Sequence, residues 1–275
     1  MEAMTQERTP RRKDRRPPRG YVSLARRAGE LGMTVASLRR YVNLGGVNGQ
    51  SVKVGNRIYV APDLALTPAR RRRGAAVAGR RASLTRETGE TRVSVEVALD
   101  GRGRDRVRTG NAMLDHLLQQ LARHGLLDLT VEAKGDAVPD AHHLVEDVAI
   151  TIGRALRQAV GEGRGIRRMG HATVPLDEAL VQVTIDVGGR GYAVVETGLE
   201  NRTLGNLGGD LVGHFLERLA LEGGMNLHSR VLAGGDPHHV AEALFKALAR
   251  ALRMALELDP RAAGEVPSTK GTISE

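Results

Sequence analysis

One helical pattern occurs twice in this sequence. "DAHHLVEDVAITIGRALRQA" occupies residues 140–159, and "DPHHVAEALFKALARALRMA" occupies residues 236–255. Each stretch opens with His-His-x-x-Glu and continues with apolar residues at helical spacing. The chain has nine histidines, and these two motifs use four of them. The repeat period, near 97 residues, is longer than that of solenoid repeats, so the pattern indicates two copies of one larger unit.

The duplication extends upstream of both motifs. At an offset of 98 residues, His116 matches His214, and apolar or glycine positions after them match too: Leu118 with Leu216, Leu121 with Leu219, Ala122 with Ala220, Gly125 with Gly223 and Leu129 with Leu227. Periodicity predicts strands at 91–99, 127–135, 179–189, 192–199 and 226–234, and helices at 113–127, 142–160, 211–221 and 238–258. The sequence therefore predicts an internally duplicated α+β fold with an aliphatic core.

The repeated histidines form a candidate metal site. Neighbouring residues on a helix point about 100° apart, so the two histidines of a pair can serve different metal ions. An isolated pair is more typical of a solvated helix start, but the duplication favours ligation. The predicted ligands are His116, His142, His143, Glu146, His214, His238, His239 and Glu242. Without cysteine the set suits Mn, Fe or Zn, and its size favours two six-coordinate ions, which we expect to be Mn(II).

The charge divides the chain. Residues 1–80 hold 18 Lys and Arg against 5 Asp and Glu, whereas residues 81–275 hold 23 against 27. Residues 1–20 are predicted to be a disordered basic arm, and residues 67–81 a basic linker. Between them, residues 21–66 predict two helices and then a hairpin around Gly55-Asn56, and they resemble the small winged-helix DNA-binding modules of mercury-regulator and excisionase type. Such a module implies DNA contact by Arg39 and Arg40, although a solvated face or a protein-docking surface would use the same residues.

Composition narrows the remaining classes. The chain has no Trp, two Phe and four Tyr, which is a poor basis for stacking on nucleic-acid bases. No apolar run approaches the length of about 20 residues needed to cross a membrane, and no apolar signal-peptide core follows the basic N-terminus. We therefore expect a soluble cytoplasmic protein without a membrane partner.

Several motifs carry a family resemblance. "LDHLLQQLARHG", "GDAVPDAHHLVED", "PLDEAL", "GGDPHHVAEALFKALARALR" and "PSTKG" stand in order, and residues from about 82 to 274 resemble the imidazoleglycerol-phosphate dehydratase family, which removes water from imidazoleglycerol phosphate in histidine biosynthesis. The resemblance implies two βαββα-type halves, 82–175 and 176–275, each a four-stranded sheet with two helices. It also implies two manganese ions on the eight ligands named above, and active sites between the subunits of a homo-oligomer, a 24-mer.

The resemblance also assigns the substrate site. Glu90, with Glu87 as an exposed neighbour, falls on the acid/base glutamate that transfers protons. Besides Glu90, the implied catalytic set comprises His142, His143, Glu146, His238, His239 and Glu242. The implied phosphate-binding residues are His124, Arg168, Arg190, Lys246, Ser268 and Lys270, which are suitable donors for an anion. Asp177 and Glu178 are expected to support either the fold or the metal ligands.

Two other functions stay open from the sequence. The chain departs from the family pattern at Met113, His171, Asp236 and residues 188–191, so a paralogue acting on a related imidazole or triazole phosphate is one alternative. The basic N-terminal region supports another, a DNA-binding regulator in which the dehydratase body is an oligomer that senses metal or ligand.

Overall fold

The computed structural model describes residues 17–43, 47–48, 51–54, 57–66, 79–135 and 141–273, and the chain divides into two compact units between Ala76 and Val77. Most of the predicted arm 1–20 and linker 67–81 lies outside the described residues, as does the Gly55-Asn56 loop. None of the helices in the described part combines the length and apolar character that a membrane crossing requires.

The N-terminal unit has a small core of its own. Its elements are β1 (Val22–Ser23), α1 (Leu24–Glu30), α2 (Val35–Asn43), β2 (Val47–Asn48), β3 (Ser51–Val54), β4 (Arg57–Val60) and β5 (Ala65–Leu66). Ser23 caps α1, and its side chain accepts the Arg26 N–H. The buried residues are Leu24, Ala28, Leu38, Val60 and Leu64. The predicted order of two helices and a hairpin is present, because Val54 pairs with Arg57 across β3 and β4.

The C-terminal unit contains two copies of one arrangement. The first copy contains β6 (Arg81–Glu87), β7 (Thr91–Ala98), β8 (Asp105–Arg108), α3 (Ala112–Gly125), β9 (Asp128–Gly135) and α4 (His142–Val160). The second contains β10 (Met169–Leu176), β11 (Ala179–Asp186), β12 (Tyr192–Glu196), β13 (Thr203–Leu204), β14 (Leu207–Gly208), α5 (Gly209–Gly223), β15 (Asn226–Ala233) and α6 (Pro237–Leu256), after which a 3₁₀ turn covers Pro260–Ala262. The strand orders β6-β7-β9-β8 and β10-β11-β15-β12 are the same.

These sheets confirm the duplicated α+β fold and correct two details of the prediction. Each half runs β-β-β-α-β-α, apart from the short β13–β14 pair, and is not of the predicted βαββα type. The second half begins with β10 at Met169, so the predicted division at 175/176 cuts through a strand. Strands β6, β8 and β10 were missed because they are polar on one side; in β8, Asp-Arg-Val-Arg, only Val107 is buried.

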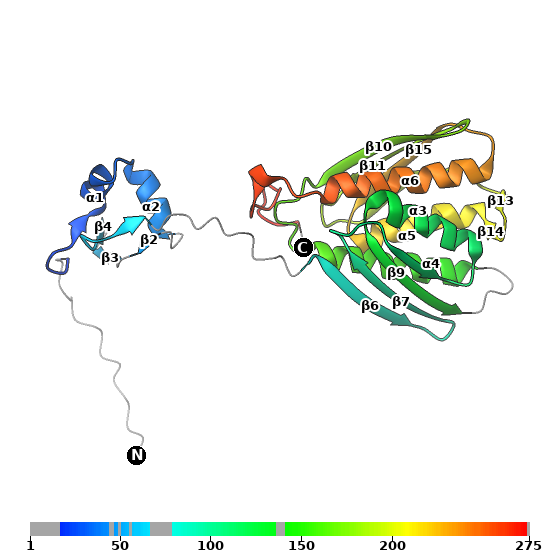
Figure 1. Ribbon diagram of the computed structural model, residues 1–275, viewed down its shortest axis with the longest axis horizontal. Helices are drawn as coiled ribbons and strands as arrows, with labels where there is room; N and C mark the ends of the chain where they lie inside the picture. The colour runs from blue at the N-terminus through cyan, green and yellow to red at the C-terminus, as the bar shows by residue number, and fades with distance from the viewer. Residues whose placement is uncertain are drawn as a thin grey trace, which may run out of the picture. The chain divides into compact units, whose positions relative to one another are not determined.

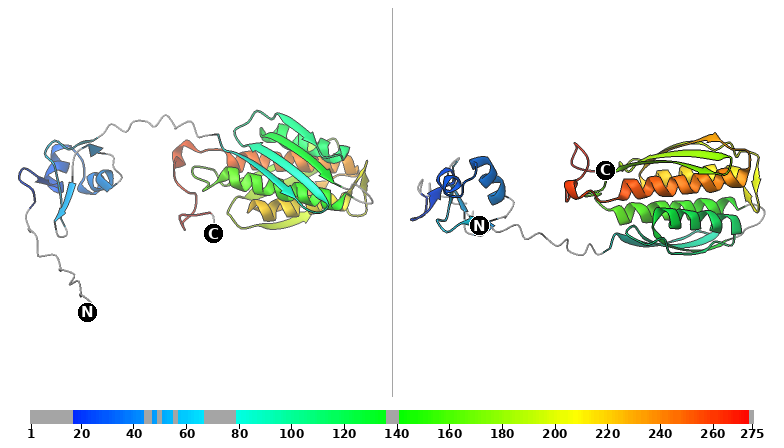
Figure 2. Two further views of the ribbon diagram at one scale, coloured as in Figure 1. Left: turned by 90° about the horizontal axis from the view of Figure 1, so that it is seen from below. Right: turned by 45° about the horizontal axis from the view of Figure 1, so that its top comes forward.

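Four helices form a layer between the two sheets (Figures 1 and 2). Helix α4 packs on β6 and β7, and α6 packs on β10 and β11, while α3 lies against α6 and α5 against α4. The core between them is one cluster of Leu, Val, Ala and Ile, with Phe215 and Phe245 in contact at 5.3 Å between ring centroids. The aliphatic core is confirmed.

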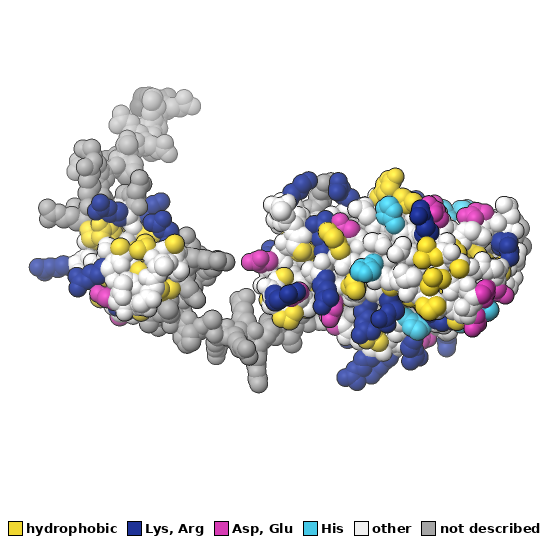
Figure 3. Space-filling model, turned by 90° about the horizontal axis from the view of Figure 1, so that it is seen from above, with side chains coloured by type: hydrophobic (Ala, Val, Ile, Leu, Met, Phe, Trp, Pro, Cys, Tyr) yellow, Lys and Arg dark blue, Asp and Glu magenta, His cyan; other side chains and the backbone are white. Residues whose placement is uncertain are grey.

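Among the described helices of the C-terminal unit, those that contact the sheet β10-β11-β15-β12, α5 and α6, lie on its inner side (Figure 2). His171, His228 and Arg230 are exposed on its outer side, and Figure 3 shows histidine and basic side chains spread over the face seen from above. His171 and His228 both pair with Thr184, on either side of β11, which puts them two strands apart, or about 10 Å. At that separation the two imidazole rings are too far apart to bind one metal ion.

The close approach of β10 to α6 requires a residue without a side chain. A Cβ on Gly170 would lie 2.1 Å from the Ala251 carbonyl oxygen and 2.7 Å from the Ala255 nitrogen. Both are backbone atoms, so relief requires the helix to move away from the strand.

We therefore expect Gly170→Ala to lower the free energy of unfolding by about 1–3 kcal/mol, as overpacking does in other cores. Gly213→Ala is the matched control, because its new methyl would meet only a Val195 methyl at 3.8 Å. The control should be neutral or stabilising, since alanine favours a helix. Denaturant unfolding of both variants measures the difference, and equal stabilities would contradict the packing account.

Candidate metal centre and substrate site

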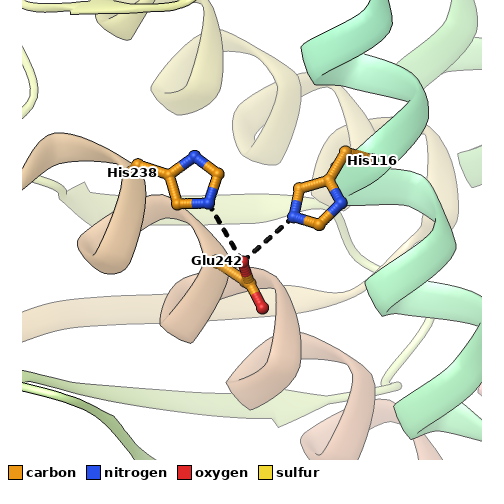
Figure 4. A group of neighbouring side chains, drawn as sticks. All are labelled: His116, His238 and Glu242. Atoms are coloured by element: carbon orange, nitrogen blue, oxygen red, sulfur yellow. Dashed lines mark hydrogen bonds and ion pairs between the residues drawn. The ribbon is translucent and has the colours of Figure 1, made fainter.

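The first ligand group contains His116, His238 and Glu242 (Figure 4). Glu242 Oε2 lies 3.0 Å from His116 Nε2 and 3.2 Å from His238 Nε2. The two imidazole rings are stacked, 5.5 Å apart and inclined by 18°. Ligand atoms of all three residues lie within 4.8 Å of one another. The group therefore presents two imidazole nitrogens and a carboxylate to one point.

Local sequence sets the start of α6, where this group begins. Asp236 is the N-cap, and its side chain accepts the N–H of His238 at 2.7 Å and of His239 at 3.4 Å. Pro237 occupies the first turn, where it is tolerated because its missing N–H is not needed. His238 and Glu242 are then four residues apart and share one face of the helix.

The second ligand group contains His142, Glu146 and His214. The rings of His142 and His214 are stacked at 4.7 Å, and His214 Nε2 lies 3.5 Å from Glu146 Oε1. This nitrogen is buried and makes no hydrogen bond within the described structure. Arg218 also approaches Glu146, at 3.4 Å. A buried imidazole nitrogen aimed at a carboxylate fits a divalent cation placed between them.

Each group combines the two halves of the duplication. His116 comes from α3 of the first half and joins α6 of the second, whereas His214 comes from α5 of the second half and joins α4 of the first. The repeat alone left open which histidine serves which metal. The pairing follows from tertiary contact of α3 with α6 and of α4 with α5.

The second histidine of each pair points away from these groups. His143 Nδ1 lies 3.1 Å from Glu90 Oε2, and His239 Nδ1 lies 2.8 Å from Glu178 Oε2. The two side chains of each pair leave the helix about 100° apart, and their rings are nearly perpendicular. Of the eight predicted ligands, six therefore form two groups of three, and His143 and His239 lie outside both.

Two carboxylates in or beside these groups, Glu242 and Glu178, are held ionised. Burial alone would raise the pKa of Glu242, but hydrogen bonds from Lys246 and His116 outweigh it and lower that pKa to about 2. Hydrogen bonds from the Asp236 backbone N–H and from His239 likewise lower the pKa of Glu178 to about 2. The same contact with Glu178 raises the pKa of His239. An ionised carboxylate beside two imidazole nitrogens, as in the Glu242 group, suits Mn, Fe or Zn ions.

The predicted phosphate-binding residues lie in two places. Arg168, Arg190, Ser268 and Lys270 line one pocket beside the C-terminal segment. The Arg168 guanidinium there binds both oxygens of Asp186, at 2.6 and 2.9 Å, and donates to the Pro267 carbonyl at 2.9 Å. Arg168 thus fixes the C-terminal segment, and Arg190 and Lys270 remain as the pocket's other cations.

The other two predicted residues lie beside the first ligand group. Lys246 Nζ is 2.7 Å from Glu242 Oε1. Burial, and then the positive charge of Lys246, lower the pKa of His124, which keeps this imidazole neutral. His124 and Lys246 therefore belong with the Glu242 group and not with the Arg168 pocket.

The pocket and the ligand groups lie at opposite ends of α6. The Arg168 N–H donates to the Ala255 carbonyl near the end of α6, whereas His238 is in its first turn. Seventeen residues separate these positions, about 26 Å along a helix. This distance exceeds the length of a small phosphorylated substrate.

Sequence reasoning missed the residues that fix the turn carrying Glu90. Asp147 on α4 is buried, and its carboxylate accepts from Arg86 at 2.6 Å and from Thr91. Thr88 Oγ1 in turn accepts the N–H of Glu90 at 3.3 Å. An acidic residue beside Glu146 in a buried helix was the available signal, but its partners come from distant strands.

In the N-terminal unit, Arg39 is exposed on α2. Arg40 belongs to the same helix, but its side chain lies outside the described residues. Exposed Lys53 on β3 and Arg57 on β4 add positive charge to the hairpin.

The fold and the two ligand groups define a class: an internally duplicated α+β protein whose central helices present His and Glu sets suited to divalent metals. The family model for imidazoleglycerol-phosphate dehydratase matches residues 109–252. Imidazoleglycerol-phosphate dehydratase of Dehalococcoides mccartyi strain 195 is 54% identical over 194 residues, which cover 70% of this chain and 97% of the relative. The chain belongs to the imidazoleglycerol-phosphate dehydratase family.

Further relatives agree with this assignment. The enzyme of that name from Methanothermobacter thermautotrophicus is 52% identical, with 70% of this chain and 98% of the relative covered. The crystal structure of the Pyrococcus furiosus dehydratase matches with a TM-score of 0.60 and 34% identity, over 69% of this chain and 99% of that chain. The Staphylococcus aureus structure matches with a TM-score of 0.59 and 30% identity, over 65% and 99%.

Asp147 should make stability depend on pH. Although burial works in the opposite direction, hydrogen bonds from Thr91 and Arg86 lower the pKa of this carboxyl. A lowered pKa in the folded state contributes stability above the unfolded value, near 4, and this contribution is lost as pH falls through the folded value.

Asp147→Asn should therefore be less stable than wild type between pH 5 and 8, by about 3 kcal/mol for a broken buried pair. The gap should narrow below about pH 4, because the carboxyl of the unfolded wild-type chain then binds a proton while the folded one stays ionised to lower pH. Denaturant midpoints of the two proteins over this pH range are the measurement. A gap that stays constant down to pH 3 would show that Asp147 does not act through its charge.

Proposed function

We propose that this chain catalyses the metal-dependent dehydration of imidazoleglycerol phosphate to imidazoleacetol phosphate in histidine biosynthesis. The observation that carries the proposal is the pair of His-His-Glu groups, formed by six residues that the duplication places at equivalent positions. Its relatives of about 50% identity bear the name of this dehydratase. A cytoplasmic location goes with this function.

The proposed cofactor is a pair of Mn(II) ions. Each group supplies three ligands from one chain, and a divalent ion of this kind takes about six. His143 and His239, which lie outside the groups of their own chain, are proposed as the fourth ligands in groups of neighbouring copies. Four protein ligands leave two positions for substrate atoms on each ion.

A homo-oligomer follows from the same reasoning. The Arg168 pocket lies about 26 Å from the His238 end of α6, so a substrate held at one end does not reach the other. Phosphate bound by Arg190, Ser268 and Lys270 of one copy would therefore serve the ligand groups of another. The family resemblance makes a 24-mer the expected assembly.

The product carries its carbonyl on the second carbon from the imidazole ring, so the hydroxyl must leave from the carbon beside the ring and the proton from the second carbon. A bound divalent ion would supply Lewis acidity to a ring nitrogen and so stabilise the charge that develops on the ring. Glu90 is proposed to take the proton from the second carbon. The hydroxyl on the carbon beside the ring leaves as water after gaining a proton, and the resulting enol relaxes to the ketone on the second carbon. Lys246, which contacts Glu242, and neutral His124 nearby are proposed to hold Glu242 in position beside the imidazole ring of the substrate.

The metal assignment is tested with His143→Ala. We expect this variant to bind less Mn(II) than wild type and to lose dehydratase turnover by at least about 100-fold, because one of the two metal sites loses one of its four protein ligands. His171→Ala is the control, since His171 is an exposed histidine outside both groups. Mn(II) stoichiometry by electron paramagnetic resonance and turnover after EDTA treatment and Mn(II) reloading are measured on both. Full Mn(II) stoichiometry in His143→Ala would refute its role as a ligand, and a metal-loaded wild type without turnover would refute the dehydratase.

A second function is proposed for the N-terminal unit, namely binding of duplex DNA, with a protein partner as the alternative. Arg39 on α2 and Lys53 and Arg57 on the hairpin are exposed cations on a unit that has its own core. The described acidic residues there are Glu30, which is paired with Arg26 and Arg27, and Asp63. Exposed cations of this kind suit contact with a phosphate backbone.

Arg39→Ala in the full chain should weaken duplex binding about fivefold or more. It should also lower the slope of the logarithm of affinity against the logarithm of salt concentration by roughly one. Arg26→Ala is the control, because Arg26 is also exposed but is paired with Glu30. Fluorescence anisotropy at several salt concentrations reports both quantities. If the wild-type chain shows no salt-dependent binding to duplex DNA, the DNA-binding proposal is wrong, and a protein partner is the remaining candidate for this unit.

A further inference from the structure

We propose that Glu178 is a positioning residue that fixes the tautomer and orientation of His239 for metal binding, and that the duplicated fold has divided the roles of two equivalent glutamates, leaving Glu90 for proton transfer. This inference rests on the proposed function, because it assigns a task within the same site.

The two glutamates occupy the same place in the two halves. In the first half Glu87 pairs with Arg92, and the Thr88 N–H bonds to the Thr91 carbonyl, so Gly89 and Glu90 form the hairpin tip. In the second half Leu176 pairs with Ala179, which leaves Asp177 and Glu178 at the tip. Each glutamate directly precedes the second strand of its hairpin and faces the second histidine of the following motif.

Glu178 is fixed from three directions. Its Oε1 accepts the N–H of Gly235 at 3.2 Å and of Asp236 at 2.9 Å, and its Oε2 faces His239 Nδ1 at 2.8 Å. The side chain thereby ties the β10–β11 hairpin to the residues that begin α6. Its position is set by backbone atoms, so the imidazole bound to it is set as well.

This contact determines which ring nitrogen can bind a metal. An ionised carboxylate only accepts hydrogen bonds, so Nδ1 of His239 must carry the proton. In neutral imidazole the other nitrogen, Nε2, then has a lone pair available for a cation. Asp177 Oδ2 lies 3.5 Å from this Nε2, beyond a normal hydrogen bond, and leaves the nitrogen accessible.

Glu90 is held less firmly. Its ion pair with His143 is longer, at 3.1 Å, and the side chains of Glu90 and His143 are 61% and 58% exposed, against 46% and 31% for Glu178 and His239. Pro139 stands four residues before His143, where Gly235 stands before His239, and proline has no N–H to donate. Pro139 itself lies outside the described residues, but a proline cannot donate the N–H that Gly235 gives to Glu178. The more exposed carboxylate of Glu90 is the one suited to approach a substrate carbon.

The test measures Mn(II) affinity of the full chain by electron paramagnetic resonance of free Mn(II). In Glu178→Gln the amide oxygen still accepts from the backbone, but the amide nitrogen donates to Nδ1, which moves the imidazole proton to Nε2. We expect affinity at the affected site to fall about 10–100-fold. Asp177→Asn removes the same charge from the same turn without removing a hydrogen bond, and should change affinity less than about threefold on the same scale.

A double-mutant cycle separates positioning from a general structural effect. In a His239→Ala background, Glu178→Gln should have no further effect on Mn(II) affinity, because the residue it positions is absent. Glu90→Gln should reduce kcat strongly, with a smaller loss of Mn(II) affinity than Glu178→Gln.

Three results would overturn the inference while leaving the proposed function intact: wild-type affinity in Glu178→Gln, an equal loss in Asp177→Asn, or an undiminished loss in the His239→Ala background. Equal effects of Glu90→Gln and Glu178→Gln on both affinity and kcat would refute the division of roles. A wild-type chain that binds no Mn(II) would instead refute the proposed function, and this inference with it.

Discussion

The angle of about 100° between adjacent helical residues decides how each His-His pair is used. His238 shares a helix face with Glu242 and joins His116, whereas His239 is turned toward the β10–β11 hairpin. The same division occurs at His142 and His143. The two adjacent histidines of each pair therefore lie in different surroundings. The first faces the neighbouring helix, and the second faces a hairpin tip. The rest of the site follows from this division.

The two halves have kept this geometry while their supports diverged. In the first half, Arg86, Thr91 and Asp147 fix the hairpin to α4 by buried polar contacts. Register places Val174, Ala179 and Ala243 at the equivalent positions of the second half, where they belong to the apolar core. Apolar packing and a fully hydrogen-bonded polar cluster of similar volume can contribute similarly to stability. The second hairpin is instead anchored by Glu178, which supports the view that the glutamates have separate tasks.

The sequence predicted the duplication and the ligand types, because both are written in local periodicity and spacing. It did not predict that His116 would join Glu242 and not Glu146, since that pairing depends on how α3 crosses α6. Polar edge strands such as β8 were missed because only Val107 marks them as buried. The separation of Arg168 from Lys246 was also not predictable, since both are basic residues and only the fold places one at the far end of α6.

The separation of these elements within one chain would link metal binding to the proposed assembly. Each ligand group offers three side chains, and the histidines that could complete it face hairpins elsewhere on the same chain. A cation that takes a fourth ligand from a second copy adds its binding free energy to the contact between copies. In the proposed oligomer, assembly would in turn bring the Arg168 pocket of one copy toward the ligand group of another. A site divided as proposed would be complete only in the oligomer, so loss of metal should loosen the assembly before it unfolds the aliphatic core of each chain.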